Sequence, residues 1–201
     1  MQRKAFGTML CPVARTLERV GEWWSILILR DAFYGLTRFD QFQVSLGIAP
    51  NMLTRRLNAL VAAGLLARQR YSKRPLRYEY VLTDRGRDFW PVLVALMTYG
   101  NRHFAREGAA MQLADAQTGK TVEPVLVDRA SGAALDRENY KLAPGPAANA
   151  ALRMRMQYAD RRRAKQDADA EWAAYVRLRK GSEARKTSRP GSRARARRAR
   201  A

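Results

Sequence analysis

The spacing of apolar residues changes at Gly64, and this change constrains the fold more than any other feature of the sequence. Before Gly64, four segments carry apolar side chains at helical spacing, and each stops within two residues of a glycine; they are residues 12–20, 23–33, 38–46 and 50–63. The last one begins with Pro50, which suits a first helical turn because its missing N–H would have no partner there. The first part of the chain is therefore expected to form short helices.

After Gly64, residues of β-strand type replace the helical pattern. Residues 66–71 and 77–82 are predicted strands, the second of them with a clear alternation of aromatic or aliphatic and polar side chains. The short basic segment 72–76 joins them. These three segments predict a β-hairpin directly after the helices.

A further helix is expected after the hairpin. Thr83 is placed to cap it, and its apolar stripe continues towards Phe104, with Pro91 inside it expected to bend it. Short helices, a hairpin and a long helix in this order are typical of a winged helix-turn-helix. We therefore predict a mainly α fold with a small β-hairpin wing over residues 8–104, in one domain.

The 50–63 segment has two different faces when drawn as a helix at about 100° per residue. Leu53, Leu57 and Leu60 fall in one sector and are expected to anchor the helix on the core. The opposite sector carries the polar and cationic side chains Asn51, Thr54, Arg55 and Asn58, and no acid. Arg pairs with guanine and Asn with adenine in the major groove, so this face fits duplex DNA. Arg56 falls on the flank, where a phosphate contact or packing is expected.

The charge around this helix is one-sided. No Asp or Glu occurs from Phe42 to Tyr78, whereas seven Arg and Lys do. Cations at the hairpin tip are placed to meet phosphates or to enter the minor groove. A solvated helix face or a solvated basic turn explains each feature singly, but together they favour DNA. The predicted DNA-binding set is Arg38, Pro50, Asn51, Thr54, Arg55, Arg56, Asn58, Lys73, Arg74 and Arg77.

The composition agrees with a polyanionic partner and argues against several other classes of protein. Lys and Arg number 38 against 18 Asp and Glu, a formal charge of +20. A single cysteine and a single histidine cannot form an internal disulfide or a Cys/His zinc site, so no metal is expected. No nucleophile motif, glycine-rich phosphate loop or paired carboxylate is present, so neither an enzyme nor a cofactor is expected.

The sequence also lacks an apolar run long enough for a transmembrane helix, and the apolar stretch before Cys11 is too short for a secretory signal. We therefore expect a cytoplasmic chain, associated with the nucleoid and not with a membrane.

The remainder of the chain is less regular. Residues 105–146 are expected to form a small β extension, with one strand over 121–128 and a second towards Leu142. Residues 147–180 have helical composition, and residues 181–201 are expected to be a disordered basic tail because they contain no large apolar side chain.

The motifs of residues 8–104 resemble those of the HxlR-type winged helix-turn-helix transcriptional regulators of bacteria. The resemblance rests on the combined spacing of Cys11-Pro12, Arg38-Phe39, the run from Pro50 to Leu57, Tyr78-Glu79-Tyr80 and the run from Leu82 to Gly86. One departure is Trp23, where the family usually has a basic residue.

The resemblance implies a homodimer on a roughly palindromic operator, with the first and last helices of the domain in the dimer contact. The apolar residues expected in that contact are Val13, Leu17, Phe89, Leu93, Leu96, Tyr99 and Phe104. Ordinary core packing is the alternative role for the residues of the last helix, and the two roles can coexist.

Some members of the family sense oxidants or electrophiles through a cysteine near the N-terminus, and Cys11 matches that position. A thiol at a helix start next to Arg15 is a candidate redox sensor, with an oxidant or another small molecule as effector. The alternative is a small buried apolar residue.

A non-specific architectural nucleic-acid-binding protein, driven by the basic tail, is the alternative function. An RNA-binding accessory protein fits less well because the sequence shows no aromatic stacking platform.

Overall fold

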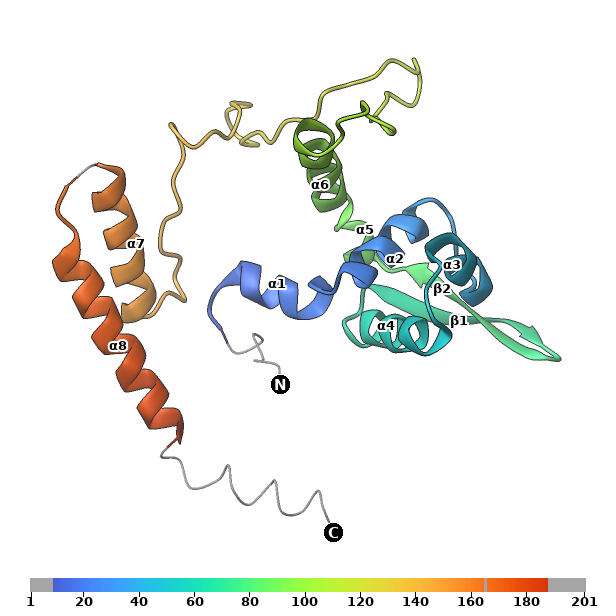
Figure 1. Cartoon of the computed structure of the whole chain (residues 1–201), viewed down its shortest axis with the longest axis horizontal. Helices are drawn as coiled ribbons and strands as arrows, with labels where there is room; N and C mark the ends of the chain where they lie inside the picture. Colours follow the sequence, from blue (N-terminus) through green and yellow to red (C-terminus); the bar gives the residue numbers. More distant parts are fainter. Residues whose placement is uncertain (1–8, 165, 188–201) are drawn as a thin grey trace, which may run out of the picture. The chain divides into compact units, whose positions relative to one another are not determined.

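The structure is a computed structural model that describes residues 9–164 and 166–187, the last six of these by their backbone alone. The chain divides into two compact units, Met1–Leu135 and Asp136–Ala201, which are considered one at a time (Figure 1). None of the described helices combines the length and the apolar character needed to cross a membrane.

The first unit begins with four helices and a hairpin, as the sequence predicts (Figure 1). The helices are α1 (Pro12–Val20), α2 (Trp23–Phe33), α3 (Phe39–Leu46) and α4 (Pro50–Ala62), followed by the strands β1 (Leu66–Lys73) and β2 (Leu76–Leu82). The winged helix-turn-helix fold is thereby confirmed.

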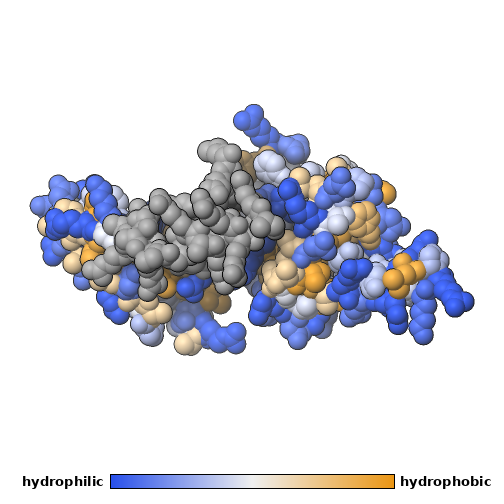
Figure 2. All heavy atoms as spheres, turned by 90° about the horizontal axis from the view of Figure 1, so that it is seen from below, coloured by the Kyte–Doolittle hydropathy of each residue, from blue (hydrophilic) through white to orange (hydrophobic). Residues whose placement is uncertain are grey.

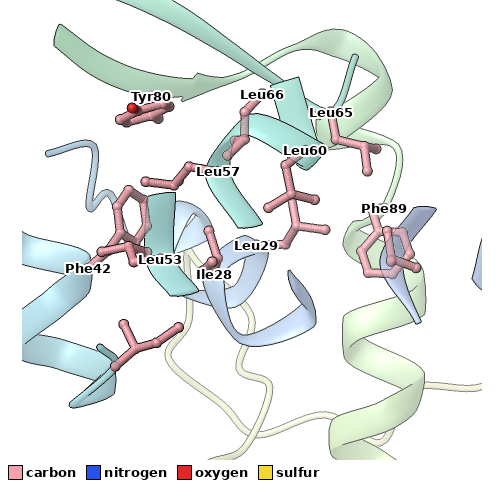
Figure 3. Packing of buried hydrophobic residues seen from close by; sticks show 12 residues of the cluster. Ile28, Leu29, Phe42, Leu53, Leu57, Leu60, Leu65, Leu66, Tyr80 and Phe89 are labelled. Atoms are coloured by element: carbon pink, nitrogen blue, oxygen red, sulfur yellow. The ribbon is translucent and has the colours of Figure 1, made fainter. Parts of the chain in front are cut away.

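The core of this unit forms around the apolar face of α4. Leu53, Leu57 and Leu60 have no exposed surface, and they pack in one cluster with residues such as Ile28 of α2 and Phe42 of α3 (Figure 3). The anchoring role expected for the three leucines is confirmed. Because interiors are close-packed, the rotation of α4 about its axis is fixed by this contact, and its polar face is turned to solvent.

The strands of the hairpin are longer than expected. They pair in antiparallel register, with Leu66 opposite Leu82, and β1 continues to Lys73, so that only two residues, Arg74 and Pro75, connect them. An irregularity of register lies between Arg70 and Ser72. A bulge of this kind increases the local twist and bends the strand.

Thr83 joins the end of α4 to the end of the hairpin. Its hydroxyl oxygen accepts a hydrogen bond from the Gly86 N–H at 3.0 Å, and the hydroxyl donates to the Gly64 carbonyl at 2.6 Å. A Cβ at Gly86 would lie 2.1 Å from the Leu65 carbonyl oxygen, so only glycine fits this close approach. The cap expected at Thr83 is therefore confirmed.

The prediction of a single bent helix from Thr83 to Phe104 is wrong. The segment forms two helices, α5 (Asp84–Arg87) and α6 (Trp90–His103). Pro91 lies in the first turn of α6, where a residue without an N–H is tolerated, and it cannot continue the helix that precedes it.

The β extension is also reduced in comparison with the prediction. Two isolated bridges, Ala114 with Thr121 and Val127 with Ala134, replace the expected strands among the described residues of 105–146. Both bridges close turns that are organised by a carboxylate. Hydrogen bonds from Thr118 lower the pKa of Asp115, with a larger effect from the backbone N–H than from the hydroxyl. Hydrogen bonds from Ser131 lower the pKa of Asp128, with a larger effect from the hydroxyl than from the backbone N–H. A hairpin with most of its side chains exposed gains too little burial to extend these bridges into strands.

In the second unit, the helical segment expected over 147–180 is divided into two helices. α7 (Ala150–Arg163) is capped by the side chain of Asn149, and α8 (Asp169–Thr187) lies beside α7 as a helical hairpin (Figure 1). α8 includes the first seven residues of the tail expected to be disordered. Residues 188–201 of that tail lie outside the described part of the chain.

Shortening one buried leucine of α4 tests this account of the core. Leu57→Ala is expected to lower the free energy of unfolding by about 2–5 kcal/mol because it leaves a cavity among fully buried neighbours. Val44→Ala on α3 is the matched control: its side chain is 84% exposed, and the change is expected to stay within about 0.5 kcal/mol. Chemical denaturation at one protein concentration measures both. Equal losses for the two variants would contradict the assigned core.

Candidate nucleic-acid interface

The exposed face of α4 carries the side chains that the sequence assigns to base contacts. Asn51, Thr54, Arg55 and Asn58 are all exposed, on the side of the helix opposite the buried leucines. The Thr54 hydroxyl donates a hydrogen bond to the Pro50 carbonyl at 2.9 Å. That bond occupies the hydroxyl hydrogen and leaves the Thr54 methyl group and oxygen lone pairs for a ligand. The face therefore combines hydrogen-bond donors, acceptors and an apolar group, and it carries no acid.

The wing, β1 with β2, is the second part of the interface. Lys73, Arg74 and Arg77 are exposed at its tip, where hydrophilic side chains dominate the right end of the view in Figure 2. Further back, the Arg68 guanidinium lies 3.6 Å from the centre of the Tyr78 ring. Such cation–π contacts hold an arginine in place while its edge stays available to an anion.

Arg38 connects the helices to the wing. It is the N-cap residue of α3, where its backbone N–H donates to Gln41 Oε1 at 2.9 Å. Its guanidinium lies 4.7 Å from the centre of the Tyr71 ring, next to the bulge of β1. One residue earlier, the Thr37 carbonyl accepts a hydrogen bond from the Tyr80 N–H at 2.7 Å. These contacts attach the wing to the segment between α2 and α3, so the predicted residue Arg38 lies between the two parts of the interface.

Arg56 differs from the other predicted DNA-binding residues. Its guanidinium forms an ion pair with Glu22 at 2.8 Å, and only 12% of its side chain is exposed. Of the two roles expected for Arg56, the structure favours packing over a phosphate contact. The pair joins the start of α2 to α4 and thereby helps to set the position of the exposed polar face of α4.

The apolar residues expected in a dimer contact fall into two groups. Val13, Leu17, Leu96, Tyr99 and Phe104 are between 47% and 72% exposed. Phe89 is 8% exposed and belongs to the core, and Leu93 packs against that core. For these two residues the alternative role, ordinary packing, is the one that the structure shows.

Cys11 is the residue that precedes α1, and it is half-buried. Arg15, expected beside the thiol, instead donates a hydrogen bond from Nε to the Met9 carbonyl at 2.6 Å. The backbone N–H of Arg15 donates to the Cys11 carbonyl at 3.1 Å, while its guanidinium is engaged by Met9. The half-buried position of Cys11 is compatible with access by a small reagent.

Comparison with known proteins agrees with this geometry. The sequence model of the HxlR-like helix-turn-helix family matches residues 19–108. The HTH-type transcriptional regulator Rv3095 of Mycobacterium tuberculosis is 41% identical over 141 residues, which are 70% of this chain and 89% of that regulator. The chain belongs to the HxlR family.

Two solved structures are similar to this HxlR-family chain. PA1374 of Pseudomonas aeruginosa, a candidate transcription factor, is 56% identical, with a TM-score of 0.54; the match covers 72% of this chain and 99% of that one. PA1607, another candidate transcription factor, is 38% identical, with a TM-score of 0.64 over 71% of this chain and all of that one. The chain is therefore a helix-turn-helix transcriptional regulator with additional residues beyond these matches.

Two features of the interface were missed by sequence reasoning. The Glu22–Arg56 pair joins residues 34 positions apart, and the Arg38–Tyr71 stack joins residues 33 apart. Neither pairing has a local signal, because the contact depends on how α2, α3 and the wing pack. The exposed Tyr71 in a basic strand was the only hint of an aromatic partner for an arginine.

A double-mutant cycle tests whether the Glu22–Arg56 pair is structural. Arg56→Met and Glu22→Gln are each expected to lower the free energy of unfolding by about 1–3 kcal/mol, because each leaves a partly buried charged group without this partner. The double variant should lose less than the sum, with a coupling of about 1 kcal/mol.

Arg55→Met serves as the control because Arg55 is exposed on the same helix, and its unfolding free energy should stay within about 0.5 kcal/mol of wild type. Chemical denaturation of the wild type, the two single variants and the double variant gives the cycle, and Arg55→Met is measured in the same way. Strict additivity of the Glu22 and Arg56 substitutions would show that the pair contributes nothing to α4 positioning.

Proposed function

We propose that this HxlR-family regulator binds operator DNA as a homodimer, with α4 in the major groove and the wing on the phosphate backbone or in the minor groove. The observation that carries the proposal is the two-sided character of α4. Three leucines without exposed surface hold one side on the core, and the acid-free face with Asn51, Thr54, Arg55 and Asn58 is open to a ligand. A major groove accepts a helix with such a face.

The proposed homodimer is supported by apolar side chains that this unit leaves exposed. α6 has no fully buried residue, and Leu96, Tyr99 and Phe104 expose between 47% and 72% of their surface, as do Val13 and Leu17 near the start of the chain. Covering these residues with a second copy removes apolar surface from water. A two-fold dimer also presents two α4 helices to half-sites about one DNA turn apart.

The alternative is an architectural protein that binds nucleic acid through charge alone. The side chains of α4 favour sequence-specific binding. Such a binder needs cations, whereas two amides and a threonine share this face with a single arginine, Arg55. Amide groups add little to phosphate attraction but discriminate among base edges.

Two substitutions, one of an arginine and one of a lysine, separate base reading from phosphate binding. Arg55→Ala is expected to weaken binding to the preferred site by about 1–3 kcal/mol and to relax the preference at one base position. Lys73→Ala should weaken binding to all sequences alike and lower the salt slope by about 1 for each bound subunit. Selection from randomised duplexes, followed by titrations at several salt concentrations, measures both effects. The proposal is wrong if Arg55→Ala keeps the wild-type preference at every base.

The redox response is a further part of the proposal. Cys11 is partly exposed immediately before α1, the helix that carries Val13 and Leu17 of the proposed dimer contact. Oxidation or alkylation of the thiol would add bulk or charge beside that contact, so it is expected to change operator affinity. Cys11→Ser should bind the operator like the wild type and lose the oxidant-dependent change. A response of wild-type size in the Ser variant would remove Cys11 as the sensor.

A further inference from the structure

The C-terminal unit is the most basic part of the molecule and extends beyond the similar structures. Residues 136–201 hold 19 Lys and Arg against 7 Asp and Glu, more than half of the formal charge of +20. PA1374 and PA1607 are matched over 99% and 100% of their length, yet these matches cover only 72% and 71% of this chain. The family match ends at residue 108, before this unit begins.

The helical part of this unit has an ordered scaffold of its own. The Tyr158 ring of α7 lies 5.1 Å from the Trp172 ring of α8, and Trp172 lies 5.2 Å from Tyr175. Ala168, between the helices, is buried, and Arg161 pairs with Glu171 at 2.8 Å across the hairpin. The cations of α7 and α8 are therefore held on a defined surface, in contrast to cations of an unstructured tail.

Several carboxylates of the unit are already engaged. Asp160 pairs with Lys141 at 3.1 Å, and Glu171 pairs with Arg161. Asp136 accepts hydrogen bonds from the backbone and the side chain of Asn139, which lower its pKa. These acids stabilise the α7–α8 hairpin and the segment that leads into α7.

Several cations on the same helices have no such partner. Arg155 and Arg162 are seven residues apart on one face of α7, and Arg177 and Lys180 are three apart on one face of α8. All four are exposed, and none forms an ion pair or a side-chain hydrogen bond with another described residue. Solvated helices usually carry charges of both signs at i, i+3 or i, i+4 spacing, and the three arginines have no Asp or Glu at either spacing. The left part of Figure 2 shows mostly hydrophilic side chains on this unit.

We propose that the α7–α8 hairpin is a second DNA-binding element, which contacts the phosphate backbone of the same duplex that α4 binds. The inference deepens the proposed function and rests on it. Fixed cations on two adjacent helices complement a polyanion, and attachment to a unit that already binds DNA raises the effective concentration of duplex around the hairpin. A membrane-bound helix would need a broad apolar face, whereas the aromatic residues of this hairpin pack against one another.

The test uses the full chain with Arg155, Arg162 and Arg177 all replaced by alanine. The matched control replaces Arg106, Lys120 and Arg129, three exposed cations of the first unit, by alanine, so both variants have three fewer positive charges. Affinity for a duplex that contains the preferred site, and for an unrelated duplex of the same length, is measured at several salt concentrations. Circular dichroism and tryptophan fluorescence report on the folding of both variants.

The hairpin variant is expected to lower the salt slope by about 2–3 for each bound subunit on both duplexes, because each phosphate that the protein no longer neutralises reduces the slope by about 0.9. Its affinity at 0.1 M salt should fall by about 10- to 100-fold, its base preference should not change, and the slope of the control should fall by less than about one unit. Replacing the same three arginines by lysine keeps the charges and should restore most of the slope.

Equal slopes for the hairpin and control variants would overturn the inference while leaving the function of α4 intact. Loss of binding to single-stranded RNA or to phosphatidylglycerol vesicles, with unchanged duplex binding, would also overturn it and assign the surface to another partner. A wild-type protein without preference between the two duplexes would instead contradict the proposed function. The lysine variant can also fail to restore the salt slope while the circular dichroism signal of the helices is lost. This result would show that the arginines support the fold of the hairpin, and it would overturn the inference as well.

Discussion

Burial of one side of α4 is the contact on which the rest of the first unit depends. Leu53, Leu57 and Leu60 have no exposed surface, and residues of α2, α3 and the hairpin complete the cluster around them. Packing of this density leaves α4 a single rotation about its axis. That rotation determines which side chains of α4 face outward. The leucines that stabilise the core therefore also determine which residues form the exposed polar face of α4.

The sequence was sufficient for the parts of the molecule whose signal is local. The helix bounds up to α4, the Thr83 cap and the two faces of α4 follow from spacing, glycine positions and capping chemistry within about ten residues. Long-range contacts were not predictable in this way. The inward position of Arg56 depends on Glu22, and the burial of Phe89 depends on packing against the core.

The errors have a common physical origin, which is the competition between a local pattern and the need for a partner surface. The apolar run near Val125 has strand composition, but only isolated bridges form because most of its side chains remain exposed. The sequence pattern predicts Pro91 inside one helix, whereas a new helix, α6, starts there. The missing N–H of Pro91 therefore costs no helical hydrogen bond. Between α7 and α8 the chain turns back, and packing of Tyr158 on Trp172 offsets the cost of that turn.

The outward side of α4 has a consequence for control of the protein. Its two amides and its hydroxyl carry no ionisable proton near neutrality, so their hydrogen-bonding character does not depend on pH. Control of the fit between this side and a ligand can instead come from the position of the helix. A tilt or shift of α4 would have to strain the Glu22–Arg56 pair and the Thr83 junction, because both join α4 to its neighbours.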